Sequence, residues 1–275
     1  MGATDAGRPL ALIKGAGDLA TGVALRLQRS GFAVVMTEIA RPTVVRRTVA
    51  FAEAVYEGRT VVEGIEGVRV EDAGGVEDAL ARMAVPVVID PAGSILLWLD
   101  PRVVVDAIVA KRNLGTRITD ASVVIALGPG FLAGHDAHAV IETMRGHSLG
   151  RVIIEGAALP NTGAPAELGG VSADRVIRSP ATGVFRGARQ IGDHVGVDEI
   201  VGYVGEVAVR SRLEGVLRGL LHPGLEVTEG FKLGDVDHRA GREECYLVSD
   251  KAMAIAGGVL EAACGLLGGV HFGRA

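Results

Sequence analysis

Cysteine, aromatic residues and an excess of basic residues are all scarce in this chain of 275 residues. Its two cysteines cannot form a disulfide framework or a four-ligand zinc site. Aromatic residues are only 4% of the sequence, so the core must be built from Val, Ala, Leu and Ile. The formal net charge of −5 argues against a protein that coats nucleic acid, because such proteins carry a basic face.

Targeting and membrane segments are also lacking in the sequence. No charged region followed by a short apolar run opens it, so we expect no secretory signal. The most apolar window, Ala252–Val270, contains Glu261 and five glycines, which a lipid-spanning helix would resist. We therefore expect a cytoplasmic protein without membrane contact.

Glycine, in contrast, is abundant, with 40 residues, about twice the usual share of roughly 7%. No Gly-x-y period is present, which excludes collagen. The glycines therefore indicate tight turns and close backbone approaches. Hydrophobic residues at 48% and charged residues at 22% exclude wholesale disorder.

The first half of the chain alternates short β-rich runs with helical stretches, which is typical of a mostly parallel sheet with helices on both faces. We therefore predict a Rossmann-like α/β fold, with ligands outside the carboxyl ends of its strands. The expected strands are Leu10–Lys14, Phe32–Thr37, Val85–Asp90, Val103–Ala110 and Ser122–Leu127, and the expected helices are Leu19–Ser30 and Pro42–Tyr56.

An internal repeat follows a turn-rich connector at residues 159–165. Residues 178–205 and 210–237 share ten identities in 28 aligned positions without a gap, so one small β unit occurs twice. Two such halves resemble the barrel-sandwich hybrid of biotinyl and lipoyl domains. In those carriers a lysine on the joining hairpin is modified, whereas here Glu206–Val209 contains none, so we expect no biotin or lipoate. The predicted organisation is an α/β domain of residues 1–172 plus 240–275 with an inserted β module at 173–239.

A glycine-rich loop follows the first expected strand and opens a helix, with the pattern G-x-G-x-x-A of dinucleotide-binding folds. Backbone N–H groups at such a loop favour a phosphate, and an acidic residue after the second strand favours ribose hydroxyls. On this reading NAD or AMP binds in preference to NADP; the alternative is a tight turn without a ligand. The predicted binding residues are Gly15, Ala16, Gly17 and Asp18 for phosphate through their backbones, Thr21 for a phosphate oxygen, and Glu38 for ribose.

Two further groups are candidates for ligand binding. Arg46 and Arg47 offer guanidinium donors to a phosphate, although a solvated helix face would suit them equally. Gly128 and Gly130 form either a second ligand-facing loop or a plain connection.

Other polar residues give no defined chemistry. His135 and His138 lack an evident third ligand, so we predict no metal site. Asp90 and Asp106 lie in or after apolar strands and need partners, for which Lys111 and Arg112 are candidates. No nucleophile, base or other catalytic residue can be defended.

Five strings of the sequence are long enough to be specific: Gly15–Gly22, Arg41–Val49, Phe51–Gly58, Val140–His147 and Ser249–Ala252. Together they resemble one family, the selenium-dependent molybdenum hydroxylase system proteins of the YqeB type. The resemblance implies an accessory or maturation factor that engages a molybdenum hydroxylase and holds a nucleotide or the pterin molybdenum cofactor. Gly257–Glu261 also looks faintly like a string of xanthine dehydrogenase accessory proteins, with Val259 in place of their cysteine.

Two other functions stay open beside the maturation factor. A free-standing NAD(P)-dependent oxidoreductase would need a proton donor beside the nicotinamide, and the sequence names none. A non-catalytic interaction scaffold would leave the glycine loop without a ligand. Whether any reaction is catalysed stays undecided at this point.

Overall fold

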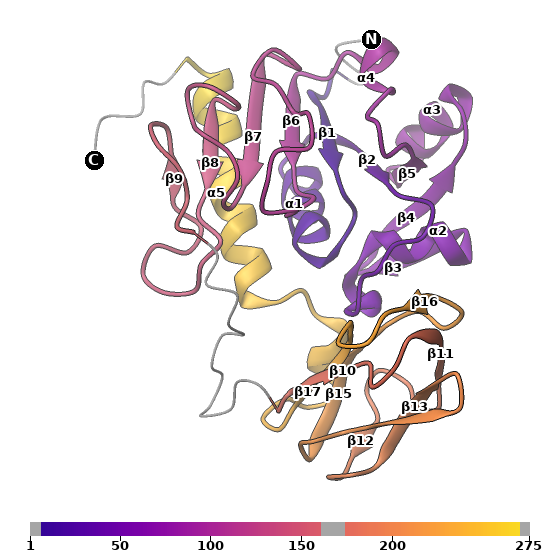
Figure 1. The fold of residues 1–275 in the computed structure, drawn as a ribbon. Helices are drawn as coiled ribbons and strands as arrows, with labels where there is room; N and C mark the ends of the chain where they lie inside the picture. The colour runs from indigo at the N-terminus through magenta and orange to yellow at the C-terminus, as the bar shows by residue number, and fades with distance from the viewer. Residues whose placement is uncertain (1–6, 161–173, 270–275) are drawn as a thin grey trace. The chain divides into compact units, whose positions relative to one another are not determined.

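The computed structural model describes residues 7–160 and 174–269, which divide into two compact units. Within the described residues, the first unit comprises 7–40, 51–160 and 248–269, and the second comprises 41–50 and 174–247 (Figure 1). Residues 41–50 and 240–247 thus group with the β-rich unit rather than with the α/β unit. Hydrogen bonds within the second unit explain this grouping: the Leu220 N–H donates to the Val45 carbonyl at 2.8 Å, and Thr48 Oγ1 donates to the Cys245 carbonyl at 2.6 Å.

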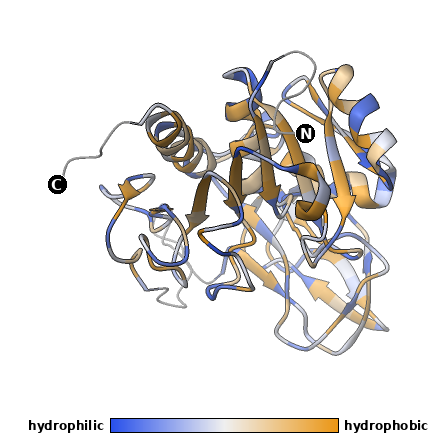
Figure 2. Ribbon diagram, turned by 90° about the horizontal axis from the view of Figure 1, so that it is seen from above, coloured by the Kyte–Doolittle hydropathy of each residue, from blue (hydrophilic) through white to orange (hydrophobic). Residues whose placement is uncertain are grey.

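A nine-stranded mixed sheet forms the centre of the first unit, in the order β3-β4-β5-β2-β1-β6-β7-β8-β9. The strands from β4 to β8 pair in parallel, whereas β3 with β4 and β8 with β9 pair antiparallel. The inner strands are continuous runs of buried Val, Ile, Leu and Ala, as expected for strands covered on both faces, and they appear hydrophobic in Figure 2. The strands are β1 (Leu10–Lys14), β2 (Ala33–Glu38), β3 (Arg59–Val62), β4 (Ile65–Val70), β5 (Val85–Ile89), β6 (Val103–Asp106), β7 (Val123–Leu127), β8 (Ala139–Ile141) and β9 (Val152–Ile153).

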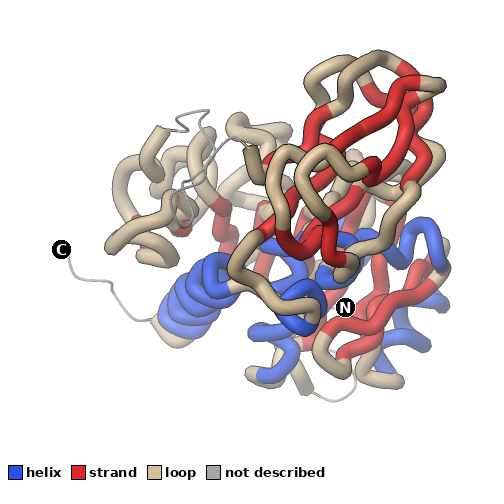
Figure 3. The backbone as a smooth tube through the Cα atoms, turned by 90° about the horizontal axis from the view of Figure 1, so that it is seen from below, coloured by secondary structure: helices blue, strands red, loops and turns tan. Residues whose placement is uncertain are grey.

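Helices cover the two faces of this sheet unequally. On one face α1 (Asp18–Arg29) packs against α5 (Asp250–Leu267), whose first turn is capped by the Ser249 hydroxyl. On the other face α3 (Ala73–Ala81) and the short α4 (Leu96–Leu99) share a core with loop residues, Phe131 among them. Apart from α5, the β8–β9 end consists largely of loop, shown in tan in Figure 3. The remaining helices, η2 (Phe51–Glu53) and α2 (Ala54–Glu57), are single turns.

The expected helix at Pro42–Tyr56 is wrong over most of its length, because only residues 54–56 belong to an α-helix, α2. Residues 41–46 form no helix, and the single turn η1 (Arg47–Val49) is the only helical element within the described residues 41–50. The physical reason is tertiary: the Val45 carbonyl accepts a hydrogen bond from the Leu220 N–H of the second unit, and β-branched residues such as Val45 have a lower helix propensity.

Two four-stranded antiparallel sheets make up the second unit, in the orders β10-β17-β15-β12 and β14-β13-β11-β16. The first repeat supplies β10 to β13 and the second supplies β14 to β17. Replacing each strand by its equivalent, β10 by β14, β11 by β15, β12 by β16 and β13 by β17, or the reverse, converts the order of one sheet into that of the other. Each sheet therefore combines strands of both repeats. The strands are β10 (Val176–Arg178), β11 (Gly183–Gly187), β12 (His194–Val195), β13 (Ile200–Val204), β14 (Val207–Arg210), β15 (Gly215–Leu220), β16 (Glu226–Val227) and β17 (Lys232–Asp237), with η3 (Glu243–Tyr246) after them.

Hydrogen bonds between the repeats follow the same exchange. The Ser179 N–H donates to the Phe231 carbonyl at 2.8 Å, and 32 residues on the Ser211 N–H donates to the Glu199 carbonyl at 2.9 Å. Each serine hydroxyl also donates to a carbonyl two residues later, at 2.6 Å in both cases. The 32-residue offset in the sequence therefore corresponds to a repeated unit in the structure.

The predicted fold class nevertheless needs correction. The sheet of the first unit is mostly parallel, as expected, with an antiparallel strand at each edge, but the connections from β6 to β7 and from β7 to β8 contain no helix. A doubly wound fold would place helices on both faces at those crossovers. The second unit is a pair of antiparallel sheets with exchanged strands, and we describe it as that rather than as a biotinyl-type module.

In the described parts of the chain, each helix is too short or too polar to cross a lipid bilayer.

Candidate functional site

A cleft of about 210 Å³ opens at the carboxyl ends of β1, β2, β5 and β6. Parallel pairing brings its polar residues together, since Lys14 is the register partner of Asp106 on one side and of Thr37 on the other. Glu38 ends β2, and the turn 90–93 follows β5. The left-handed Gly15 (φ +93°) lets the loops after β1 and β6 approach, because a Cβ there would lie 3.1 Å from the Ala107 carbonyl oxygen.

A buried hydrogen-bond network forms the floor of the cleft. Lys14 Nζ donates to Thr116 Oγ1 and to Asp120 Oδ2, both at 3.0 Å. The Thr116 hydroxyl in turn donates to Asp106 Oδ2 at 2.6 Å. Burial raises the pKa of Asp106 above its ordinary value, and the hydrogen bonds from Thr116 and Ile108 and the charge of Lys14 offset only part of this effect. Lys14 has three N–H donors, so one is left to point elsewhere, and Gly93 lies beside its terminal carbon.

Glu38 supplies a second carboxyl group to the cleft. Its two oxygens accept hydrogen bonds from the Ala16 and Ile39 N–H groups, each at 2.8 Å. Burial raises the pKa of Glu38, and these two backbone hydrogen bonds lower it by less. The cleft lining thus holds three carboxyl groups, those of Glu38, Asp90 and Asp106, against one ammonium group.

The rim of the cleft is apolar. Ile39, Ile108 and Leu114 line it and are 44%, 41% and 53% exposed, which is unusual for large aliphatic side chains gathered at one site. A polar floor under an apolar rim is the general make-up of small-molecule sites.

The predicted glycine loop lies beside this cleft, but two of its four N–H groups and the Thr21 hydroxyl bond within the chain. The Gly15 N–H donates to the Thr37 carbonyl, and the Ala16 N–H donates to Glu38. Thr21 is fully buried; its hydroxyl donates to the Ala16 carbonyl and accepts from the Phe51 N–H, so it holds the loop in place rather than a phosphate oxygen.

The start of α1 is also occupied by charge. Gly17 is the residue before the helix and Asp18 is the first helical residue, where its carboxylate interacts favourably with the helix dipole. Together with Glu38 at Ala16, this puts two carboxyl groups where the sequence predicted a phosphate.

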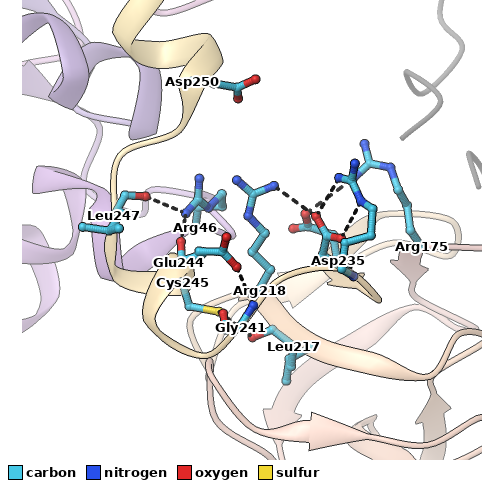
Figure 4. A network of polar contacts seen from close by, with 12 residues as sticks. Arg46, Arg175, Leu217, Arg218, Asp235, Gly241, Glu244, Cys245, Leu247 and Asp250 are labelled. Atoms are coloured by element: carbon cyan, nitrogen blue, oxygen red, sulfur yellow. Dashed lines mark hydrogen bonds and ion pairs between the residues drawn. The ribbon is translucent and has the colours of Figure 1, made fainter. Parts of the chain in front are cut away.

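Arg46 and Arg47 lie in the second unit and are not part of the cleft lining. Arg46 Nη2 donates to the carbonyls of Glu244 and Leu247, at 3.3 and 3.1 Å (Figure 4). Arg47 Nε donates to the Leu220 carbonyl at 2.7 Å. Both guanidinium groups therefore hold segment 41–50 to the rest of its unit.

Gly128 and Gly130 form a connection after β7 and do not line the cleft. Gly130 adopts φ +106°, and a Cβ on it would lie 2.6 Å from the backbone of Arg112, so glycine is needed for packing of two loops. Asp106, for which Lys111 and Arg112 were candidate partners, bonds to Thr116 instead.

The two histidines considered for a metal have other partners. His138 Nδ1 accepts the Val124 N–H at 3.0 Å, and burial lowers the pKa of this imidazole. His135 lies beside Asp136, with 3.1 Å between Nδ1 and Oδ1.

Sequence reasoning found Glu38 but missed Lys14, Thr116 and Asp120. A usable signal was present in Lys14, a charged residue that ends an otherwise apolar five-residue strand and so needs a partner. Thr116 and Asp120 carry no comparable signal, because they lie in a loop more than 100 residues away.

Comparison with known proteins returns no matching family model. Among solved structures, the chain is similar to a succinylglutamate desuccinylase/aspartoacylase from Rhodobacter sphaeroides, with 15% identity, 86% of this chain and 85% of that chain covered, and a TM-score of 0.27. It is also similar to an aspartoacylase family protein from Mesorhizobium loti, with 12% identity, 83% and 85% coverage, and a TM-score of 0.26.

The topology of the two units corrects the Rossmann-like class with a barrel-sandwich hybrid, and the internal hydrogen bonds of the glycine loop correct the predicted nucleotide-binding function. The predicted molybdenum hydroxylase maturation factor and its alternative, an NAD(P)-dependent oxidoreductase, both relied on a nucleotide or cofactor at that loop. We therefore withdraw these functions. At such low identity and TM-score, the likeness assigns no activity to this chain.

One curated relative is much closer in sequence. "Uncharacterized protein YqeB" of Escherichia coli (strain K12) is 51% identical over 256 residues, which cover 93% of this chain and 47% of that protein. The chain therefore spans about half the length of the curated relative that it matches. The match supports the YqeB part of the sequence resemblance and contains nothing about selenium or molybdenum. By sequence, this chain is a homologue of about half of YqeB.

Proposed function

We propose that the first unit binds a small organic molecule whose polar end is cationic or rich in hydrogen-bond donors. The observation that carries the proposal is the cleft itself, in which Glu38 and Asp106 lie near Lys14 beneath the apolar rim of Ile39, Ile108 and Leu114.

The charge balance of the lining selects the sign of the ligand. Three carboxyl groups face one ammonium group, and Lys14 already contacts Asp120. Burial raises the pKa values of Glu38 and Asp106, so their ionised forms are under-compensated. A cationic or donor-rich group supplies the missing compensation, whereas a phosphate would meet like charge.

The size of the cleft limits the size of the ligand, and its apolar rim indicates the character of the ligand's body. About 210 Å³ is below the roughly 300–1,000 Å³ of sites for drug-sized ligands, so a dinucleotide would lie mostly outside it. The three exposed aliphatic side chains favour an apolar body next to the polar end.

Benzylamine and benzoate test the proposal, because they share an aromatic ring and differ in the sign of the polar end. Isothermal titration calorimetry should show that benzylamine binds and benzoate does not. Glu38→Gln and Asp106→Asn should each weaken benzylamine binding about tenfold or more, as loss of a charge-assisted hydrogen bond does. The matched control is Glu77→Gln, an exposed carboxylate on α3 that does not line the cleft.

Ligand binding should also depend on pH. Protonation of Glu38 and Asp106 removes the charge that attracts an amine, so affinity should fall as the pH drops through their raised pKa values. Preference for benzoate, or an equal loss of affinity in Glu77→Gln, contradicts the proposal. So does the absence of benzylamine binding at roughly 10 mM, where binding free energies are only about 3 kcal/mol.

A further inference from the structure

A second cavity, of about 310 Å³, lies in the second unit between the first strands of the two repeats. β10 and β14 are each the terminal strand of their sheet, and they approach one another without pairing. Ile177 and Val209 line the cavity and are equivalent residues of the two repeats, 32 positions apart. The cavity therefore lies between the two repeats and is lined by equivalent residues of each.

Two equivalent arginines line the same cavity, Arg178 on β10 and Arg210 on β14. Arg178 Nη1 donates to the Gly230 carbonyl at 2.9 Å, and Arg210 Nη1 donates to the Asp198 carbonyl at 2.6 Å. Gly230 and Asp198 are themselves equivalent, so each repeat anchors the arginine of the other. One nitrogen of each guanidinium is thereby fixed, which leaves the remaining donors of both groups for another partner.

The charge of the cavity is positive. Arg212 also lines it, and Asp198 is the only carboxylate among the lining residues. Within the described residues, neither Arg178, Arg210 nor Arg212 forms an ion pair with a carboxylate, whereas Arg186, Arg189 and Arg218 of the same unit do. All three arginines are exposed, and their cationic groups therefore lack a compensating anion from the described chain.

We propose that this cavity, which we call the repeat-junction site, binds a small dianion with two separate anionic oxygen groups. Two guanidinium groups held in equivalent places suit a ligand with two equivalent ends, and the planar guanidinium matches both carboxylate and phosphate oxygens. The apolar residues Ile177 and Val209 suit a short linker between the two ends. The inference does not depend on the cleft of the first unit.

Pyrophosphate and glutarate are the probes, because each has two anionic ends, phosphate in one and carboxylate in the other, and acetate is the monoanion for comparison. Titration calorimetry at low ionic strength should show binding of at least one dianion and much weaker binding of acetate, with affinity falling as salt is added. Which of the two probes binds more tightly distinguishes phosphate from carboxylate ligands.

Substitution then tests the role of symmetry. Arg178→Gln and Arg210→Gln should each weaken dianion binding about tenfold and to a similar degree, and the double variant should lose about a hundredfold. Arg178→Lys and Arg210→Lys, which keep the charge and the fold, should lose less than the glutamine variants. Arg186→Gln is the control, since Arg186 is exposed on β11 and pairs with Glu206.

Several results would overturn the inference: no dianion binding, equal binding of acetate, or the same loss of affinity in Arg186→Gln as in Arg178→Gln. A ten-residue oligoglutamate peptide completes the panel. Binding of this peptide without binding of either small dianion would also overturn it, and would identify the surface as a docking site for an acidic protein segment.

Discussion

The pKa values of buried carboxyl groups are shifted in opposite directions in the two units. In the first unit, Glu38 and Asp106 are held mainly by backbone N–H groups and a threonine, and burial raises their pKa values. In the second unit, Asp237 faces Arg239 and Arg218. Burial alone would raise the pKa of Asp237, but the hydrogen bonds and charges of these arginines outweigh it and lower the pKa.

This difference in compensation shows which carboxyl groups a cationic ligand would stabilise. Carboxyl groups that are already compensated by arginine, such as Asp237, stabilise the unit in which they lie. Carboxyl groups that are buried without full compensation lower stability when ionised, and such groups gather at functional sites. The comparison therefore favours the cleft of the first unit, and not the charged cluster of the second, as a place for a cationic ligand.

The largest expected effect is on the second unit, from Asp237→Ala. This change leaves Arg218, whose side chain is largely buried, without its carboxylate, and we expect about 3 kcal/mol of destabilisation. Hydrogen exchange of β15 and β17 in increasing urea would measure it. Glu206→Ala, which removes an exposed carboxylate paired with Arg186, should cost less than about 0.5 kcal/mol. Equal costs in the two variants would remove the distinction between the units.

In the first unit, Thr116→Val should cost about 2 kcal/mol. The change removes the hydroxyl that links Lys14 to Asp106 and leaves both groups short of a partner in a buried place. Trp98 is the single tryptophan of the chain and lies in the first unit, so urea unfolding followed by its fluorescence reports on that unit. The exposed Thr119 provides the control variant Thr119→Val, which should leave the unfolding midpoint nearly unchanged.

The smallest effect, and the sharpest for the comparison, is the pH dependence of stability, which should have opposite sign in the two units. The raised pKa values of Glu38 and Asp106 mean that the first unit gains stability below their ordinary values, 4.5 and 3.8, and loses it as the pH rises through the raised ones. The lowered pKa of Asp237 contributes stability to the second unit above 3.8, which is lost as the pH falls through the lowered value.

Each unit of pKa shift is worth about 1.4 kcal/mol, so the two slopes can be measured separately by Trp98 fluorescence and by hydrogen exchange of β17. Glu38→Gln should flatten the profile of the first unit and leave that of the second unchanged. Parallel slopes in the two units would show that the carboxyl groups are compensated alike.

Local patterns in the sequence were sufficient for several elements. The apolar run Leu10–Lys14 is β1, and the helical spacing after the glycine loop gives α1. Such elements are fixed by short-range periodicity. Segment 42–46 was mistaken for a helix because the hydrogen bond of Val45 to Leu220 depends on a residue that is distant in the sequence.

The candidate site could be predicted only in part, because several of its contacts join residues that are distant in the sequence. Glu38 could be placed because it ends a strand beside a glycine loop, and strand ends gather at one edge of a parallel sheet. The direction of its carboxyl group, toward the Ala16 N–H, depends on loop conformation and turned an expected phosphate site into an acidic one. Thr116 reaches Asp106 through a loop that carries no periodic signal.

The reciprocal hydrogen bonds of the second unit bear on its origin. Because Ser179 bonds into the second repeat and Ser211 bonds into the first, neither repeat satisfies all of its own backbone groups. A single copy, as a separate chain, would find those partners only in another copy, related to it by a twofold axis. The second unit thus has the bonding scheme of an isologous homodimer whose two subunits have been joined head to tail by the short connection between β13 and β14.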